Sequence, residues 1–522
     1  MSDGGEANLV LVNARLWTPG YLKPKNGGLA ICGGRIIRVG SNERCESAAG
    51  DGAQIIDVGG QLILPGFIDA HAHMMHTGPR MKWLQLHDVG SLAQLLDVVE
   101  KEAKADVGRG SLLGRGWDES KWPERRYPTR AELDRSAGSF PVLLRRVDGH
   151  VCVANTAMLT KLGIPLDTPG FERDSNGRPT GVLRKKAMDL AGESTRPSVE
   201  ELCECFGQMI STAHSLGITS IHDIVDERGM EAYQRLHGAG KLGLRVYLMP
   251  MMKMFPQMEA ISAPPRYGDE WLRFGAIKDF SDGSLGARTA ALHRPYSDGG
   301  KERGALEHPG RALKKAVSRA HKIGFQMGIH AIGDRAIDAV IDAYENALRE
   351  HPREDHRHRI EHFELPTDDA LERCSTLGIV PVMQPNFVVE WSQPGGLYEI
   401  RLGPDRMIRN NPHRLITRQG LSLAFGSDGM PYGPIYGLQG AVTPPFSNQR
   451  ISLHKALEAY TLGGAFASCE EDIKGRLAPG YLADLVIIDG AWDGGELRRW
   501  KVTATMVGGR FVYTIPAKKR KR

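Results

Sequence analysis

Histidines occur in this sequence at positions from which they could bind a metal ion together. His71 and His73 lie two residues apart at the end of a short apolar run. If that run is a strand, both side chains point to the same face, as two ligands of one metal ion must. An H-x-H pair alone is a weak signal, because a polar strand end can carry two histidines without any chemical role.

Further residues of suitable chemistry stand at the ends of other apolar runs. They are Lys278, His330, His362 and Asp428. Imidazole and carboxylate groups suit zinc and similar divalent metals. The combined pattern is more specific than any of its parts and predicts a metal centre. The weaker alternative is that some of these histidines only satisfy loop hydrogen bonds.

Eight short apolar runs are the elements that must position these residues. We expect strands at 63–71, 218–224, 244–250, 274–280, 325–330, 358–363, 378–384 and 421–428. Amphipathic stretches lie between several of them, which favours parallel strands joined by helices. Eight such units are typical of an α/β fold of the (β/α)8 barrel type, whose active sites lie at the carboxyl ends of the strands. The candidate ligands would then converge on one mouth.

The rest of the chain adds two parts to this predicted barrel of residues 63–79 and 213–471. Residues 1–62 and 472–516 contain β-rich runs with glycine turns, so we expect one composite β domain built from both ends. About 145 residues separate the first two barrel strands, far more than an ordinary β–α connection. We therefore predict an α/β insertion at 80–212 that caps the active site.

Composition limits the class of protein. Hydrophobic residues make up 41% and charged residues 25% of the 522, which excludes a membrane bundle and a disordered chain. No uncharged apolar run approaches the roughly 18–20 residues that span a bilayer, and the N-terminus lacks the features of a secretory signal. The seven cysteines are few and odd in number, so a reducing cytoplasm fits better than a disulfide scaffold.

Net charge gives no sign of a nucleic-acid partner. The formal charge is +5, and the five basic residues of the tail 517–522 account for all of it. That tail is either a solvated terminus or a nuclear-type, polyanion-binding patch. We expect a cytoplasmic protein that acts on a small molecule and requires neither nucleic acid nor a membrane, with a homodimer as a possible assembly.

The order H-x-H, Lys, His, His, Asp on predicted strands 1, 4, 5, 6 and 8 resembles the amidohydrolase superfamily of metal-dependent hydrolases. The surrounding segments are similar to its YtcJ-like branch, which includes N-substituted formamide deformylase. One position departs from that branch, because Lys185 stands where the T-G-V-L-R-E motif usually has glutamate. The matching segments cover nearly the whole chain and are LPGFIDAHAHM (64–74), GWDESKWP (116–123), DGHVCVANTAML (148–159), KDFSDGSLGARTAAL (278–292), HAIGDRAID (330–338), RIEHF (359–363), FGSDGMP (425–431) and GRLAPGYLADLVIID (475–489).

The resemblance implies a distorted (β/α)8 TIM barrel, a composite β-sandwich from both termini and a divalent metal site. One or two ions are expected, with zinc the first candidate. The implied imidazole ligands are His71, His73, His330 and His362. Asp428 would lie at the metal and act as the proton carrier.

Lys278 has two interpretations. It matches the position at which many relatives of this family carry a carbamylated lysine that bridges two metal ions. The alternative is an ammonium group at the barrel mouth, paired with Asp279 or Asp282.

The expected reaction is hydrolysis of a non-peptide C–N bond in an amide or a cyclic amidine-like small molecule. A divalent metal makes its bound water acidic enough to ionise near neutral pH. Asp428 would accept the water's proton and pass it to the leaving nitrogen. His330 or His362 would stabilise the oxyanion if only one of them were a ligand. Two alternatives stay open: a deaminase of a heterocyclic amine on the same scaffold, and a non-catalytic metal-binding barrel with a regulatory role.

Substrate contacts are predicted outside the metal centre. By resemblance, Trp117 provides an apolar wall and His150 a polar contact, with Asn155 and Arg288 as further substrate-binding residues. Trp117 could instead be a packing residue, Asn155 a helix cap, and Arg288 could order its own loop. Asp334 is expected to support a ligand histidine from behind.

Overall fold

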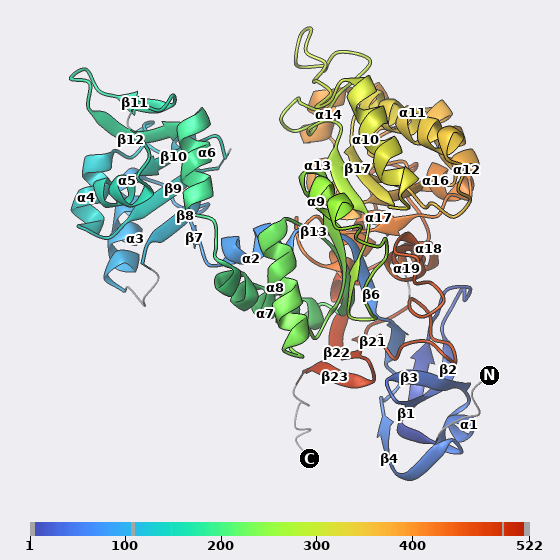
Figure 1. Ribbon diagram of the computed structural model, residues 1–522. Helices are drawn as coiled ribbons and strands as arrows, with labels where there is room; N and C mark the ends of the chain where they lie inside the picture. Colours follow the sequence, from blue (N-terminus) through green and yellow to red (C-terminus); the bar gives the residue numbers. More distant parts are fainter. Residues whose placement is uncertain (1–5, 106–109, 148, 166, 493–494, 516–522) are drawn as a thin grey trace. The chain divides into compact units, whose positions relative to one another are not determined.

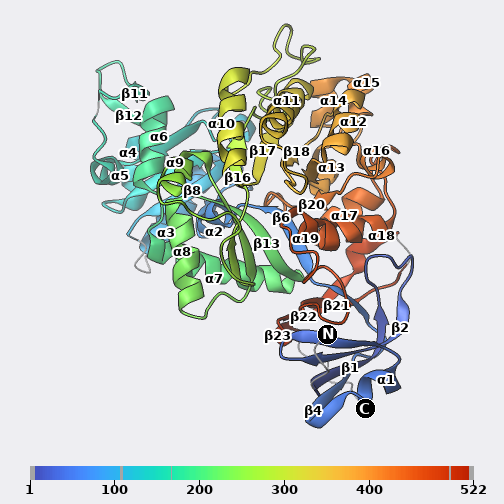
Figure 2. The ribbon, with the colours of Figure 1, turned by 45° about the vertical axis from the view of Figure 1, so that its right-hand side comes forward.

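The computed structural model describes residues 6–105, 110–147, 149–165, 167–492 and 495–515 (Figure 1, Figure 2). The chain forms two compact units. The first contains the residues through 75 and from 203 onward, and the second is formed by residues 76–202. The predicted basic tail at 517–522 lies outside the described residues.

Two parallel sheets form the centre of the first unit. The first has the order β15-β14-β13-β6 and the second the order β16-β17-β18-β19-β20. Each of the eight predicted runs overlaps at least one of these strands, and the run 274–280 spans the end of β15 and all of β16. The strands are β6 (Phe67–Ala72), β13 (Ile218–Val225), β14 (Arg245–Pro250), β15 (Leu272–Phe274), β16 (Ile277–Phe280), β17 (Met327–Ala331), β18 (Arg359–His362), β19 (Val380–Met383) and β20 (Ala424–Phe425).

The two parallel sheets meet at both edges. At one edge Met251, just after β14, forms a parallel bridge with Lys278 of β16. At the other edge the backbone N–H of Asp428 donates to the carbonyl oxygen of His71 at 2.9 Å. Gly426 permits this second approach, because a Cβ there would lie 2.4 Å from the backbone nitrogen of His71. The arrangement is a TIM-barrel-like α/β fold with the carboxyl ends of β6, β18 and β20 together.

Helices pack on the outside of these sheets (Figure 1). In α11 the buried residues Ile337, Val340, Ile341 and Tyr344 recur every three or four positions, so one face of the helix is apolar. The helices of this unit include α1 (Asn42–Glu46), α7 (Val199–Ser215, which begins in the second unit), α8 (Glu227–Gly238), α9 (Phe255–Ala260), α10 (Gly310–Lys322), α11 (Asp334–Glu350), α12 (Asp368–Leu377), α13 (Pro385–Trp391), α14 (Leu397–Leu402), α15 (Pro404–Met407), α16 (His413–Arg418), α17 (Pro434–Val442), α18 (Leu453–Glu458) and α19 (Gly464–Ala467).

Strands from both ends of the chain pair in one further sheet of the first unit. Its order is β23-β22-β21-β5-β1-β2-β3, and β4 also pairs with β1. The junction is antiparallel, with Ile63 opposite Ile487. A second sheet facing this one, which a sandwich requires, stays a prediction. The strands are β1 (Ala7–Leu16), β2 (Lys25–Cys32), β3 (Arg35–Gly40), β4 (Ala49–Asp57), β5 (Leu62–Pro65), β21 (Leu485–Asp489), β22 (Lys501–Val507) and β23 (Arg510–Thr514).

A buried ion pair ties the parallel sheets to this terminal sheet. Arg245 of β14 donates to both carboxylate oxygens of Asp484, at 2.5 and 2.9 Å, and both side chains are at most 5% exposed. Asp484 directly precedes β21, so the pair joins residues 239 positions apart in the chain. Such a buried charge requires its partner, because an isolated charge in the interior is costly.

The second unit has its own mixed sheet, in the order β11-β12-β10-β9-β8-β7. Strands and helices are interspersed along this unit, as expected for the predicted α/β insertion. The capping role predicted for the insertion (80–212) stays a prediction. The elements are α2 (Met74–Met81, which begins in the first unit), β7 (Leu84–Gln85), α3 (Leu92–Lys104), β8 (Leu112–Trp117), α4 (Arg130–Ala137), β9 (Val142–Arg146), β10 (Val151–Ala154), α5 (Thr156–Leu162), β11 (Phe171–Arg173), β12 (Pro179–Arg184) and α6 (Lys185–Ser194).

Two expectations from composition can be compared with the structure. All seven cysteines are free thiols, so the chain has no disulfide scaffold. In the part of the chain that the structure describes, no helix is both long and apolar enough to cross a bilayer.

Candidate metal centre

Three of the predicted ligands form one cluster at the carboxyl ends of the parallel strands. One ligand atom each from His71, His362 and Asp428 lies within 4.8 Å of the other two. Oδ1 of Asp428 is 3.5 Å from Nε2 of His71 and 2.9 Å from Nε2 of His73. The structure therefore brings together four of the six predicted metal-site residues from β6, β18 and the end of β20.

Hydrogen bonds on the far side of two imidazoles fix how they face the cluster. Nδ1 of His71 lies 2.5 Å from Oε2 of Glu361, and Nδ1 of His362 lies 2.7 Å from Oε1 of Gln384. Both partners are acceptors, so Nδ1 carries the proton and Nε2 keeps its lone pair. Nε2 of His71 is buried and makes no hydrogen bond. Two such lone pairs beside a carboxylate need a cation, so these residues fit a divalent metal.

Burial sets the charge of this cluster. It lowers the pKa of His71 and holds that of His362 well below its usual range, so both imidazoles are neutral, as ligands must be. Burial raises the pKa of Asp428, but His73, His71 and His362 outweigh it and bring that pKa below the usual range of a carboxyl. The cluster thus presents neutral imidazoles and an anionic oxygen at neutral pH.

Asp69 connects the strand ends that carry the ligands. Its carboxylate accepts from the backbone N–H of His71 at 3.2 Å and of Ser427 at 2.9 Å, and from the Ser427 hydroxyl at 2.5 Å. Burial raises the pKa of Asp69 to about 6, against the effect of these hydrogen bonds. Asp428, next to Ser427, has φ 56°, a left-handed conformation uncommon outside glycine. Asp69 therefore connects β6 to the turn that presents Asp428.

Glu361 and Arg359 form a buried pair behind His71 that the sequence analysis missed. Nε and Nη2 of Arg359 donate to the two oxygens of Glu361 at 2.8 and 3.1 Å, and both side chains are fully buried. Burial raises the pKa of Glu361, but Arg359 and His71 bring it to about 2. A signal was present, because charged residues in a strand expected to be buried, 358–363, need partners inside the protein. It does not reveal which partners they find.

Lys278 lies in the barrel without the ion pair that one interpretation expected. Its Nζ is buried without a hydrogen bond, 4.1 Å from the centre of the Phe280 ring. Among the described residues, Asp279 pairs with His308 at 3.4 Å, and Asp282 accepts from three backbone N–H groups. Burial lowers the pKa of Lys278 to about 8, so roughly a tenth of this amine is neutral at pH 7.

His330 lies beside the cluster but directs one nitrogen elsewhere. Its ring centre is 4.4 Å from that of His362, while its Nε2 lies 3.0 Å from the carbonyl oxygen of Gly283. Burial lowers the pKa of His330 to about 3. The nearest charged partner is Asp282 at 3.6 Å, and Asp334 instead accepts from the backbone N–H of His293 at 2.8 Å. Asp282 thus has the place beside this histidine that the sequence analysis gave to Asp334.

The remaining predicted substrate residues lie in structural surroundings of their own. Arg288, with φ 56°, pairs with Asp298 at 2.9 Å in the first unit. In the second unit, Asn155 caps α5 by accepting from the backbone N–H of Met158 at 2.9 Å. His150 is exposed. Substrate contact by any of these residues stays a prediction.

Trp117 belongs to the core of the second unit. It is fully buried, with its ring centre 5.9 Å from that of Trp122 and 5.3 Å from that of Tyr127. The packing role that the sequence analysis offered as an alternative is therefore the one observed, and an apolar wall for a substrate stays a prediction.

A cavity of about 350 Å³ opens onto the metal cluster. Its lining includes His73, His330, His362 and Asp428 together with the aromatic rings of Phe280, Phe387 and Trp391. A reacting group at the cluster and an apolar arm can thus be bound in one space.

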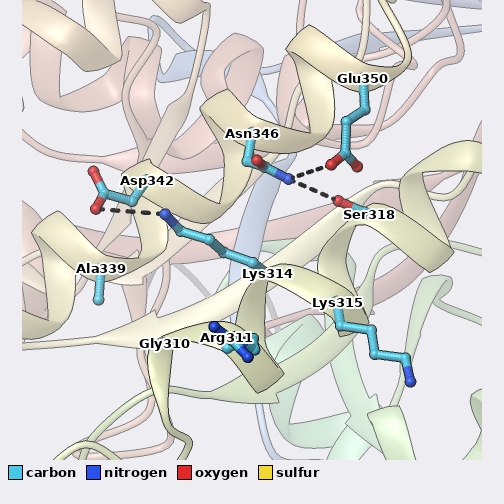
Figure 3. A pocket seen from close by; sticks show the side chains of 9 residues that line it. All are labelled: Gly310, Arg311, Lys314, Lys315, Ser318, Ala339, Asp342, Asn346 and Glu350. Atoms are coloured by element: carbon cyan, nitrogen blue, oxygen red, sulfur yellow. Dashed lines mark hydrogen bonds and ion pairs between the residues drawn. The ribbon is translucent and has the colours of Figure 1, made fainter.

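A larger hollow of about 650 Å³ lies between α10 and α11 (Figure 3). Its side chains pair with one another, Lys314 with Asp342 at 4.0 Å and Asn346 with Glu350 at 2.9 Å. Lys315 points away from this network (Figure 3). This hollow is a solvated groove between two covering helices and brings no reactive groups together.

Fold and site together define a class: an α/β barrel-like protein with a buried histidine and carboxylate cluster suited to a divalent metal. A model of the amidohydrolase family matches residues 54–513. The chain therefore belongs to the amidohydrolase family, which confirms the resemblance seen in the sequence.

Individual relatives agree with this membership. The Bacillus subtilis (strain 168) protein YtcJ is 30% identical over 92% of this chain and 94% of its own. N-substituted formamide deformylase of Arthrobacter pascens is 28% identical over 97% of this chain and 98% of its own. The crystal structure of an uncharacterized metal-dependent hydrolase from Pyrococcus furiosus superposes with a TM-score of 0.81 at 29% identity, covering 92% of this chain and 99% of that one.

Proposed function

We propose that this protein is a metal-dependent hydrolase that cleaves a non-peptide C–N bond, an amide, of a small molecule. The observation that carries the proposal is the pair of imidazoles of His71 and His362. Each has Nδ1 bonded to an acceptor and one ligand atom within 4.8 Å of a carboxylate oxygen of Asp428. A relative of similar length is named as a deformylase of N-substituted formamides, which supports an amide as the substrate.

The proposed metal ligands are the six residues of the sequence analysis. Zinc is the first candidate, because imidazole nitrogen and carboxylate oxygen are ligands that it accepts readily. When bound, such a metal supplies a water that ionises near neutral pH and polarises the substrate carbonyl. Lys278 would contribute as a carbamate, for which its buried, unpaired Nζ is suited. The ligand set is His71, His73, Lys278, His330, His362 and Asp428.

The protein's own groups then carry the remaining steps. Asp428 holds the attacking water by hydrogen bonding, accepts its proton on a carboxylate oxygen and donates that proton to the leaving nitrogen. The N–H of His362 is bonded to Oε1 of Gln384 and that of His330 to the carbonyl oxygen of Gly283, so both histidines fit the role of metal ligand better than that of oxyanion donor. The apolar cavity wall excludes bulk water, which strengthens these interactions.

The test uses the full-length chain loaded with zinc and a panel of N-substituted formamides and acetamides. We expect amine release that a chelator abolishes and added zinc restores. Asp428→Asn is expected to lower kcat by roughly 100-fold or more while zinc stays bound. Asp342→Asn, an exposed change on α11, is the matched control. Zinc-loaded protein with no turnover on the panel, or turnover unaffected by the chelator, would contradict the proposal.

A further inference from the structure

One charged side chain in the cavity has no part in the proposed chemistry. Glu364 follows β18 by two residues, is 2% exposed and lines the cavity. Its Oε2 is buried and has no hydrogen-bond partner. A carboxylate oxygen removed from water without a donor is energetically costly, so this one is available to a ligand.

The backbone holds Glu364 in place independently of its side chain. Its carbonyl oxygen accepts a hydrogen bond from the backbone N–H of Asn411 at 2.7 Å. The backbone N–H of Leu365, the next residue, donates to the carbonyl oxygen of Ile332 at 3.2 Å. Phe363 just before it has φ 50°, which turns the chain sharply after the strand. The carboxyl is thus presented by a fixed turn.

Tyr398, Asn410 and Asn411 lie within hydrogen-bonding reach of the Glu364 carboxyl, but its Oε2 has no partner, and most of the cavity wall is apolar. No lysine or arginine is among the described residues that line the cavity, so no cation of the wall neutralises this carboxyl. The acidic side chains of that described lining are Glu364 and Asp428, and Asp428 belongs to the metal cluster. The apolar part of the wall includes Phe280, Leu285, Phe387, Trp391, Leu397 and Met430.

We propose that Glu364 binds a hydrogen-bond donor, a hydroxyl or amino group, on the arm of the substrate remote from the scissile bond. The preferred substrates are then amides whose arm is apolar, fits among aromatic rings and ends in an O–H or N–H group. This inference rests on the function proposed above, and it adds the class of substrate. A donor within this low-dielectric pocket gives selectivity, because an analogue without it leaves Oε2 unpaired.

Binding of three matched amides tests the inference. The probes are N-formyltyramine, its O-methyl ether and N-formylphenethylamine, which share one skeleton and differ in the donor. Calorimetry with the full-length protein is expected to show N-formyltyramine binding roughly 10-fold or more tightly than the ether. Glu364→Gln is expected to remove most of this preference. Glu390→Gln changes an exposed carboxyl at the end of α13 that is bonded to Tyr436, and it should keep the wild-type preference.

Each outcome decides the inference. Equal affinity of wild-type protein for the phenol and the ether would overturn it without reliance on any variant. A preference that persists in Glu364→Gln with an unchanged thermal transition would overturn the assignment to this residue. Absence of binding by all three at millimolar concentration would overturn the substrate class. Donor-dependent binding without amine release would contradict the proposed function while it supports the role of Glu364.

Discussion

Replacement of Glu361 by glutamine tests how the metal centre is held. Glu361 accepts from Nδ1 of His71 through one oxygen and from Arg359 through both. Glutamine has the same shape but only one acceptor oxygen. Its NH2 group would face an N–H of either His71 or Arg359, so one hydrogen bond becomes a contact between two donors.

The expected magnitudes follow from these contacts. Loss of the group that orients a ligand histidine typically lowers metal affinity roughly 10- to 100-fold, about 1.4–2.7 kcal/mol. Arg359 is fully buried, and removing the charge of its partner leaves it uncompensated. Breaking a buried pair in this way costs about 3–5 kcal/mol of folding free energy. Glu361→Gln should therefore lower both the metal affinity and the stability of the metal-free protein.

Two measurements separate these effects. Chelator competition gives the zinc affinity of the folded variant, and urea unfolding of the metal-free protein gives its stability. Glu345→Gln is the matched control, because Glu345 is exposed on α11 and pairs with Arg373 at 2.6 Å. That change should cost about 0–1 kcal/mol and leave zinc affinity unchanged. A folded Glu361→Gln variant with wild-type zinc affinity would refute the orienting role of Glu361.

Three further predictions concern packing, pH and the buried ion pair. Gly426→Ala places a Cβ 2.4 Å from the backbone nitrogen of His71, a proposed ligand on β6. It should therefore lower the free energy of unfolding by about 1–3 kcal/mol and reduce the zinc content of the protein. Gly238→Ala, with no atom within 4 Å of its new Cβ, should do neither. Burial holds the pKa of His358 well below 6.5, so below about pH 6.5 the unfolded chain binds a proton that the folded protein does not. This residue should therefore lower the free energy of unfolding by up to about 1.4 kcal/mol for each unit that the pH falls below 6.5. In His358→Gln, the free energy of unfolding measured with urea should depend less on pH between about pH 5.5 and 7.5. Asp484→Asn leaves buried Arg245 unpaired and should cost about 3–5 kcal/mol; a loss below about 1 kcal/mol would show that the pair contributes little.

The parallel strands were readable from the sequence because both of their faces are buried. Residues of β13, β17, β18 and β19 are buried throughout. The strands β17 and β19 are mostly apolar, whereas β13 and β18 also carry buried polar residues. The candidate metal ligands could be recognised in the sequence because they lie where such strands end in histidine or aspartate. The family could be predicted from that order alone.

The contacts that hold the ligands were not readable in this way. Glu361 meets His71 across 290 positions of the chain, and Gln384 meets His362 across 22. Local periodicity predicts which face of a strand a residue occupies, but not which distant side chain the closure of the sheets brings beside it. The same limit explains the error at His330. Asp334 follows that histidine closely in the sequence, but the fold places Asp282 beside it instead.

The sequence by itself determined the family, the approximate positions of the parallel strands except for the division between β15 and β16, and the identity of the candidate ligands, because buried strands and metal ligands leave local patterns of residue type. Only the tertiary structure decided which imidazole nitrogen is free, that Lys278 has no hydrogen bond, and that Glu364 lines the cavity with an unpaired oxygen. These properties depend on partners from separate strands and turns. Folding excludes water from these polar atoms, and the tertiary structure then determines whether each of them has a hydrogen-bond partner in the protein.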